Sequence, residues 1–335
     1  MPIYNDIFSI NQVYELMVDG EWVTSAYVPP TPYGWVAGGY GSPRLSTVER
    51  INFTSDTSAL STRGSLTTGT MLAGSVESNT SGYIFGGNGD TAILGNVQKI
   101  NFSTDTSATT TVSTMPVALY GVAGKSNQTF GWYSGGTMTG NTTTLSTISR
   151  ITFSSDTTAP TNRTTLVTSR RFHAATGNND FAWFSGGILS PGPGLITATD
   201  RLVYASDTAA TTTRGSTVIR RYSLAGSTDN SSYGWVAGGY NPSAPNSLYK
   251  QSIVERINYS ADTVAAEIRG PLVAASYKLS ATGTSSFGWF FGGDGYPSYI
   301  STIQRITYSN DTATSETRNS LSGARYGTLA VYGSL

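Results

Sequence analysis

A repeat of about 51 residues runs through most of the sequence. A pair of glycines closes a short aromatic segment in every copy, at Gly38-Gly39, Gly86-Gly87, Gly135-Gly136, Gly186-Gly187, Gly238-Gly239 and Gly292-Gly293. An Asp-Thr pair follows with the same period, and its aspartates are Asp56, Asp105, Asp156, Asp207, Asp262 and Asp311. Two markers with one period in six copies are hard to obtain by chance, so we expect six copies of one folding unit.

Each unit is predicted to contain four short β-strands. The second strand is the aromatic segment, such as YGWVA or FAWFS, and it is apolar on both faces, which is typical of a strand buried between neighbouring sheets. An aromatic residue stands three positions before each Gly pair, at Trp35, Tyr83, Trp132, Trp183, Trp235 and Trp289. The third strand alternates, as in VERINF and IQRITY, and a polar fourth strand follows the Asp-Thr turn. The turn aspartate is expected to bond its own backbone two residues on.

The two ends of the repeat complement each other. The first unit begins at its second strand, after Pro32, and the chain ends with a first strand, ARYGTLAVYG, that has no second strand behind it. Pairing these ends closes a ring and leaves no unpaired sheet edge. We therefore predict an all-β protein, a six-bladed β-propeller of four-stranded blades over residues 33–335, with a short hairpin extension over residues 1–32.

Composition excludes several classes of function. The 20 basic and 20 acidic residues balance, so there is no basic surplus for a nucleic-acid partner. Cysteine is absent and histidine occurs once, which excludes disulfides, iron–sulfur clusters and zinc sites built on Cys or several His, and we expect no cofactor. No apolar run reaches the ~18 residues of a membrane span, and no secretory signal is evident.

The order of a strand ending in Gly-Gly, a variable loop, a VERI-like strand and a turn resembles the Kelch motif of galactose-oxidase-like propellers. The stretch SRRFHAAT is similar to the segment that opens a Kelch unit. The Ser/Thr-rich form of the repeat, with GWxxGG followed by I-x-R-I-x-[FY]-S-x-D-T, resembles propellers in virion proteins of tailed phages. The resemblance covers Tyr33 to Leu335, and it implies a structural role at a phage tail or capsid surface.

Catalytic groups are scarce. His173 is the only imidazole, and Ser169, Ser185 or Asp180 are the partners that a Ser-His-Asp triad would use, but a structural histidine near the propeller axis is the simpler interpretation. Paired carboxylates for glycoside hydrolysis remain an alternative, with Asp90 and Asp294 among the loop candidates. We expect no enzymatic activity.

Basic residues recur once per unit in the third strand, at Arg50, Lys99, Arg150, Arg201, Arg256 and Arg305. Five of the six units carry a further arginine in the fourth strand, at Arg63, Arg163, Arg214, Arg269 and Arg318. Positions filled in nearly every blade favour ties between blades over one asymmetric ligand site.

The loops after the Gly pairs vary in length and are expected to open on one face, where a rigid scaffold usually carries its binding residues. The longest loop runs from Tyr240 to Ser252. The candidate receptor-binding residues come from this loop and the next one, and they are Tyr240, Asn241, Tyr249, Lys250, Asp294, Tyr296 and Tyr299. Unselected loop drift, with no ligand, is the alternative.

Residues 1–32 differ from the repeat. Asp19-Gly20 between two alternating apolar segments is typical of a β-hairpin turn, and a lone hairpin is not stable in water. Its apolar residues must cover another surface, either the propeller of the same chain or a partner subunit. The candidate anchor residues are Tyr4, Phe8, Tyr14, Leu16 and Trp22.

These observations favour a non-enzymatic phage virion protein that docks on other virion subunits through residues 1–32 and displays its loops toward a host-surface glycan or receptor. Such a protein would be assembled in the host cytoplasm and located in the virion. A free Kelch-like adaptor or lectin and a glycan-active hydrolase are the alternatives.

Overall fold

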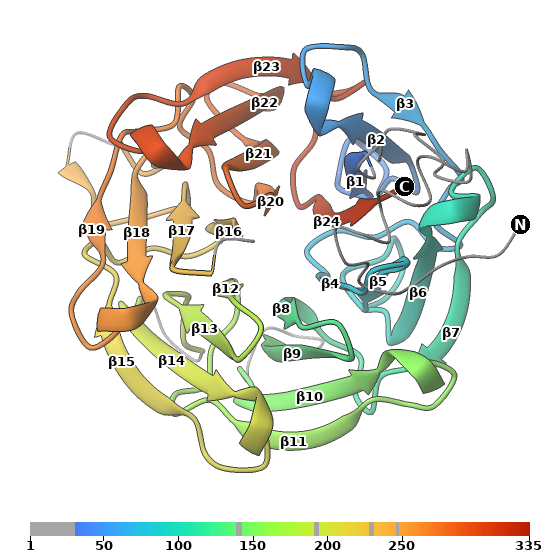
Figure 1. Cartoon of the computed structure of the whole chain (residues 1–335), viewed down its shortest axis with the longest axis horizontal. Helices are drawn as coiled ribbons and strands as arrows, with labels where there is room; N and C mark the ends of the chain where they lie inside the picture. The colour runs from blue at the N-terminus through green and yellow to red at the C-terminus, as the bar shows by residue number, and fades with distance from the viewer. Residues whose placement is uncertain (1–30, 139–142, 191–193, 228–230, 246–247) are drawn as a thin grey trace, which may run out of the picture. The chain divides into compact units, whose positions relative to one another are not determined.

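The computed structural model describes residues 31–138, 143–190, 194–227, 231–245 and 248–335. Thr31–Leu335 is one compact unit, in which six four-stranded sheets stand as blades around a central axis (Figure 1). The predicted six-bladed propeller is therefore confirmed. The predicted hairpin and its anchor residues Tyr4, Phe8, Tyr14, Leu16 and Trp22 lie outside the described residues.

Each blade runs from an inner first strand to an outer fourth strand, and neighbouring strands are antiparallel. The first strands are β24 (Leu329–Ser334), β4 (Gly74–Glu77), β8 (Tyr120–Ser126), β12 (Ala174–Gly177), β16 (Ala225–Ser227) and β20 (Ser280–Gly283). The second strands are β1 (Pro32–Ala37), β5 (Ser81–Phe85), β9 (Phe130–Thr137), β13 (Phe181–Ser185), β17 (Tyr233–Ala237) and β21 (Phe287–Asp294).

The third and fourth strands complete the blades toward the rim. The third strands are β2 (Val48–Asn52), β6 (Asn96–Asn101), β10 (Thr147–Thr152), β14 (Ala198–Val203), β18 (Val254–Asn258) and β22 (Tyr299–Thr307). The fourth strands are β3 (Ser61–Thr62), β7 (Thr110–Thr114), β11 (Thr161–Thr165), β15 (Thr212–Ser216), β19 (Glu267–Ile268) and β23 (Glu316–Ser320). A 3₁₀ turn follows each third strand, and the six turns lie near the rim in Figure 1.

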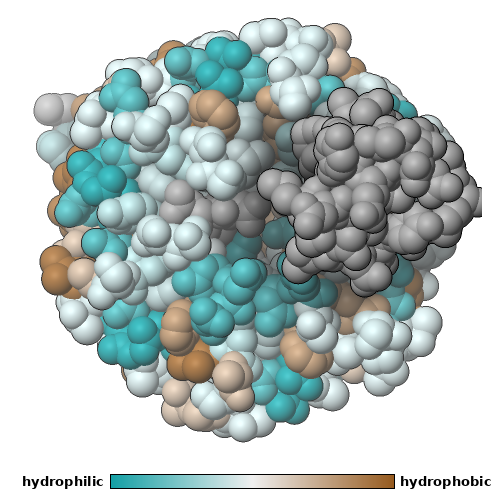
Figure 2. All heavy atoms as spheres, viewed as in Figure 1, coloured by the Kyte–Doolittle hydropathy of each residue, from teal (hydrophilic) through white to brown (hydrophobic). Residues whose placement is uncertain are grey.

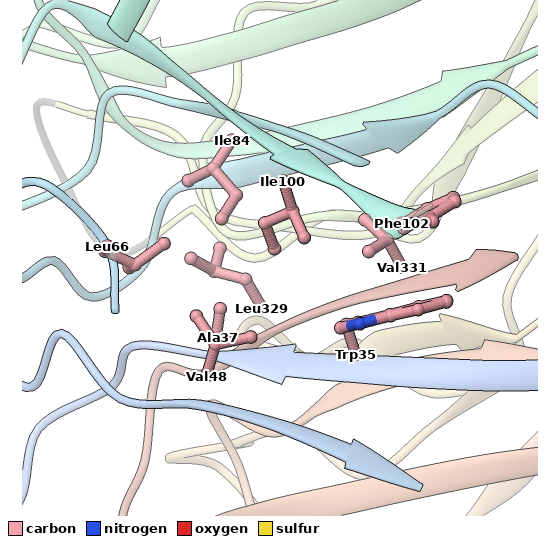
Figure 3. Packing of buried hydrophobic residues seen from close by; sticks show 9 residues of the cluster. All are labelled: Trp35, Ala37, Val48, Leu66, Ile84, Ile100, Phe102, Leu329 and Val331. Carbon is pink, nitrogen blue, oxygen red and sulfur yellow. The ribbon is translucent and has the colours of Figure 1, made fainter. Parts of the chain in front are cut away.

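The hydrophobic cores lie between blades, because the second strand of each blade packs against both of the adjacent blades. In the core between the first two blades, Trp35 stacks on Phe102 with ring centroids 4.1 Å apart (Figure 3). The equivalent aromatic pair recurs at every interface between neighbouring blades, which we call a joint. The ring centroids are between 5.0 Å apart, for Tyr83 and Phe153, and 3.7 Å apart, for Trp235 and Tyr308. The apolar character on both strand faces therefore reflects burial from both sides, as predicted.

The recurrent polar residues tie each blade to the next. Trp35 Nε1 donates to Asp105 Oδ2 at 2.8 Å, and Arg50 Nη1 donates to the same oxygen at 3.0 Å. Asp105 belongs to the following blade, so its carboxylate is an acceptor shared across the joint. The equivalent aspartates accept from Tyr83, Trp132, Trp183, Trp235 and Trp289. The prediction that the repeated basic residues are ties between blades is confirmed.

The prediction that the turn aspartates bond their own backbone is wrong, because these carboxylates are used across the joints. Asn52 fills the local role instead, since its Oδ1 accepts from the backbone N–H of Thr54 at 2.9 Å. Asn101 and Asn258 make the same turn bond.

The ring is closed by the C-terminal strand. β24 pairs with β1 in antiparallel register, with Trp35 opposite Val331, and so supplies the inner strand of the first blade. Trp289 Nε1 of the last blade donates to Asp56 Oδ2 of the first at 2.8 Å. The joint between the chain's ends therefore has the same chemistry as the other joints.

A second ring of bonds surrounds the axis. One residue near the start of each inner strand has a left-handed backbone, with φ near +60°. These six equivalent residues are Leu72, Gly121, Phe172, Ser223, Lys278 and Gly327. The backbone N–H of each donates to the carbonyl of its equivalent in the preceding blade, at 2.6–2.9 Å. These bonds form a closed circle that fixes where the six inner strands begin.

Candidate functional site at the loop face

The loops after the Gly pairs lie on one face, together with the segments that lead into the inner strands. We call this the loop face, and the opposite face, with the 3₁₀ turns, the turn face. Backbone bridges join the two kinds of segment, at Tyr40–Tyr326, Met71–Asn88, Arg171–Ile188, Tyr222–Tyr240 and Tyr277–Asp294. Each Gly pair makes this possible, because Gly38 and Gly39 have φ of +61° and +100° and a Cβ on Gly38 would lie 2.5 Å from the carbonyl oxygen of Thr70.

Buried ion pairs hold several of these leading segments. Arg325 and Arg221, which precede Tyr326 and Tyr222, pair with Glu49 and Glu255 of their own blades, and all four side chains are at most 2 % exposed. Arg170 pairs with Asp200 at 2.7 Å in the same way. A paired guanidinium fixes the segment, so the next side chain is presented at a defined place.

The structure brings Tyr240 and Tyr249 together in the longest loop, with ring centroids 5.8 Å apart. Tyr240 also lies 5.5 Å from Tyr222 and 5.0 Å from Tyr277. Asn241 has a local role, since its Oδ1 accepts from the backbone N–H of Ser243 at 3.0 Å. Of these residues, Tyr249 is 38 % exposed, so part of its side chain is accessible to solvent.

Lys250 and Asp294 form an ion pair between two neighbouring blades. Lys250 Nζ lies 2.7 Å from Asp294 Oδ1 and also donates to the carbonyl of Gly295. Burial and the Asp294 carboxylate raise the pKa of Tyr277 well above its usual value. These two predicted site residues therefore brace the loops beneath the tyrosines.

Tyr299 belongs to a second aromatic group. Its ring lies 4.8 Å from Tyr326 and 6.2 Å from Tyr40, and the latter two are 5.3 Å apart. Tyr296 stands apart, because it is 90 % exposed with its ring in solvent. The structure thus gathers five of the seven predicted site residues, Tyr240, Tyr249, Lys250, Asp294 and Tyr299, and leaves Asn241 and Tyr296 at the margin.

Sequence reasoning missed the leading-segment tyrosines. The signal was present, since Tyr120, Tyr222, Tyr277 and Tyr326 occupy one column of the repeat and Tyr40 occupies the place of Tyr240.

Seven tyrosines of three neighbouring blades form what we call the tyrosine arc. They are Tyr40, Tyr222, Tyr240, Tyr249, Tyr277, Tyr299 and Tyr326. Burial raises the pKa of Tyr326 to about 12, so its hydroxyl remains a hydrogen-bond donor at neutral pH.

Lys278 lies between the two halves of the arc. Its ammonium is 4.9 Å from the Tyr277 ring centroid and 4.4 Å from that of Tyr326. Aromatic faces attract cations at such distances. The seven rings and this ammonium therefore form one continuous surface across three blades, from Tyr222 to Tyr40.

The candidates for catalysis are separated. His173 is 4 % exposed and its Nε2 lies 2.8 Å from Ser134 Oγ, not from Ser169, Ser185 or Asp180. Burial, reinforced by the charge of Arg170, lowers the pKa of His173 well below its ordinary value. Asp294 is paired with Lys250, and Asp90 lies 3.5 Å from Arg44.

The turn face offers a different surface. A polar cavity of about 360 Å³ lies there, lined by residues such as Asn79, Gln128 and Asn179. Figure 2 looks onto this face, and outside its grey atoms the hydrophobic residues form small groups separated by polar ones. The clustered aromatic side chains described above belong to the loop face.

The described residues contain neither a metal-binding cluster of side chains nor a membrane-spanning helix. Among the described residues, no group of three or more His, Cys, Asp or Glu side chains is placed to hold a metal ion. Within the same ranges, no helix has the length and hydropathy of a membrane span.

Neither a protein-family model nor a curated protein matches the chain.

Proposed function

We propose that the protein is a non-enzymatic recognition protein of a tailed-phage virion, which binds a host-surface glycan or receptor through the tyrosine arc. The observation that carries the proposal is the arc itself, seven tyrosines from three blades on the face where the loops meet. The virion setting draws on the resemblance of the repeat to phage propellers.

A glycan suits the chemistry of the arc. A tyrosine ring offers a flat apolar face that packs on the C–H face of a sugar, and its hydroxyl bonds the sugar's hydroxyls. Tyrosine also loses little conformational entropy on binding, because it has two side-chain torsions. The Lys250–Asp294 pair and the backbone bridges hold the rings in place before a ligand arrives.

The experiment is a glycan array probed with the full chain and with three variants. Tyr249→Ala and Tyr299→Ala each remove an exposed ring of the arc, whereas Val264→Ala removes an exposed residue, 66 % accessible, from the turn face. We expect each tyrosine variant to lose about tenfold in affinity, since one good aromatic contact contributes on the order of 1–2 kcal/mol. Binding that survives both tyrosine changes would refute the arc as the binding surface.

Attachment is proposed to use residues 1–32. Because Thr31–Leu335 is a compact unit, a chain lacking residues 1–30 is expected to fold and to bind the same glycans. It should no longer co-purify with virions, whereas a free adaptor or lectin would have no such dependence. A truncated chain that still joins the particle would overturn the anchor.

The hydrolase alternative has a separate test. The loop carboxylates Asp90 and Asp294 are each held by a basic partner. Turnover of a polysaccharide that disappears in Asp294→Asn but not in Asp180→Asn would favour a glycan-active enzyme over a binding protein.

A further inference from the structure

We propose that the loop-face end of the axial channel is an anion subsite built on Lys278, and that the glycan bound by the arc is an acidic saccharide whose carboxylate enters it. This inference rests on the proposed function, because it names the class of glycan that the arc would take.

The channel is open at this end. A cavity of about 80 Å³ lies between the inner-strand starts, and its walls include Leu72, Phe172, Leu224 and Lys278. This volume suits a substituent such as a carboxylate rather than a whole sugar ring. The sugar would then lie outside, on the tyrosine arc that borders the same opening.

The fold does not require a lysine here. The circle of backbone hydrogen bonds around the axis uses only the main chain, and the equivalent positions hold Leu72, Gly121, Phe172, Ser223 and Gly327. Lys278 also has a left-handed backbone, φ +56°, which costs a side-chain-bearing residue about 1 kcal/mol relative to glycine. Leu72, Phe172 and Ser223 have the same left-handed backbone, so it is the charge that distinguishes Lys278 and indicates a role that the other blades do not share.

The ammonium of Lys278 lacks a carboxylate partner among the described residues. The nearest acidic candidate, Asp294, is held by Lys250 at 2.7 Å. Two aromatic faces, those of Tyr277 and Tyr326, are its neighbours instead. Burial lowers the pKa of Lys278, and the attraction of the Asp294 carboxylate, which is itself paired with Lys250, does not offset it.

A second cation lies beside a residue of the cavity wall. Arg171 lies 5.1 Å over the ring of Phe172, which lines the cavity. A carboxylate in the cavity would form a charge-assisted hydrogen bond with Lys278, in surroundings where such bonds are stronger than in water.

The test compares two sugars that differ only at C6, D-glucuronate and D-glucose, by titration against the full chain in saturation-transfer NMR. We expect glucuronate to bind about tenfold more tightly, a difference of about 1.4 kcal/mol, because its carboxylate forms a charge-assisted hydrogen bond with Lys278. Lys278→Met should remove this preference, so that both sugars bind equally, while Lys278→Arg should keep it. Lys125→Met, which deletes a lysine paired with Glu77 on the turn face, is the matched control.

Each other outcome has a defined meaning. Equal binding of both sugars by the wild type, or a preference that survives Lys278→Met, overturns the subsite and leaves the tyrosine arc standing. Inorganic phosphate that competes as well as glucuronate would show a general anion site and overturn the saccharide assignment. A separate result would refute the proposal that the tyrosine arc is the binding surface, namely glycan binding that is not weakened by Tyr249→Ala or Tyr299→Ala. Thermal melting of each variant confirms that the fold is intact.

Discussion

At the residue scale, the turn aspartates stabilise the interfaces between neighbouring blades. Asp56 accepts from Trp289 Nε1 at 2.8 Å, from Arg305 Nη1 at 3.1 Å and from Arg318 Nε at 2.8 Å. One carboxylate therefore satisfies an indole and two guanidinium groups at a joint that is mostly shielded from water. Removing it leaves the buried indole N–H of Trp289 without an acceptor and leaves both guanidinium groups with only the exposed Glu316 as an acidic partner, which is more costly than losing a surface pair.

The repeat supplies an internal control for this residue. Asp156 occupies the same place but accepts only from Tyr83, at 2.9 Å, and Lys99, at 2.7 Å, because Val112 replaces the fourth-strand arginine. We expect Asp56→Ala to lower the free energy of unfolding by about 3 kcal/mol and Asp156→Ala by about half as much. Urea unfolding measures both. An Asp156 variant that is as damaging as the Asp56 variant would contradict the shared-acceptor account.

His173 gives a prediction about pH. Burial, with a smaller contribution from Arg170, keeps its pKa well below the ordinary 6.5, so the folded protein holds it neutral while the unfolded chain protonates near pH 6.5. The unfolded state then binds more protons below that pH, and the folded state loses stability as pH falls, by up to about 1.4 kcal/mol per pH unit. Compared with the wild type, His173→Gln should show a flatter stability profile between pH 6.5 and more acidic values. Superimposable profiles would mean that the imidazole does not have this shift.

At the element scale, five of the six leading segments are held by one of two polar arrangements, and the third blade has Ser149 at the equivalent position instead. Three blades use a buried arginine with an acidic residue of the third strand, such as Arg325 with Glu49. Two blades use a glutamine at the acidic position, and Gln98 Oε1 accepts from the backbone N–H of Thr68 at 3.0 Å. The arginine and the carboxylate therefore occur together, because either one alone would be a buried unpaired charge.

Exchanging one arrangement for the other tests this dependence. Arg325→Thr alone should lower the free energy of unfolding by about 3–5 kcal/mol, because Glu49 would remain buried without its partner. Adding Glu49→Gln, which reproduces the pair Thr70 and Gln98, should restore most of the loss. Differential scanning calorimetry of the single and the double variant measures whether stability is restored. Losses that simply add would show that the pair is not coupled.

The elements could be predicted from sequence because the repeat displays them six times. Trp35 and its equivalents marked the second strand, and the Gly pairs marked its end. The site was only partly predictable. Tyr240 and Tyr249 lie in one loop, but Tyr40 and Tyr299 come from opposite ends of the chain and meet at 6.2 Å only once the ring closes. The position of Lys278 beside the axis was also not predictable from the sequence, since it depends on a left-handed backbone and on the axial circle of bonds.

At the scale of the whole molecule, closure of the ring brings the residues of the tyrosine arc together. β24 brings Tyr326, which precedes it, beside Tyr40, which follows β1, and beside Tyr299 of the last blade. The arc therefore spans the joint between the chain's two ends. A chain that failed to close would lose half of the arc along with the sheet.

Closure can be tested by a cross-link across that joint. Thr31 and Leu335 exchange two backbone hydrogen bonds, N to O at 2.8 Å and 3.1 Å, so they are a directly opposed pair with Cα atoms about 5.5 Å apart, within the reach of a disulfide. The chain has no cysteine, so the double variant Thr31→Cys with Leu335→Cys introduces the only thiols. We predict an intramolecular disulfide in the monomer under mild oxidation, and none when Val264→Cys replaces Leu335→Cys. Two thiols that remain free to alkylation in the folded double variant, or that link only different molecules, would contradict the closed ring.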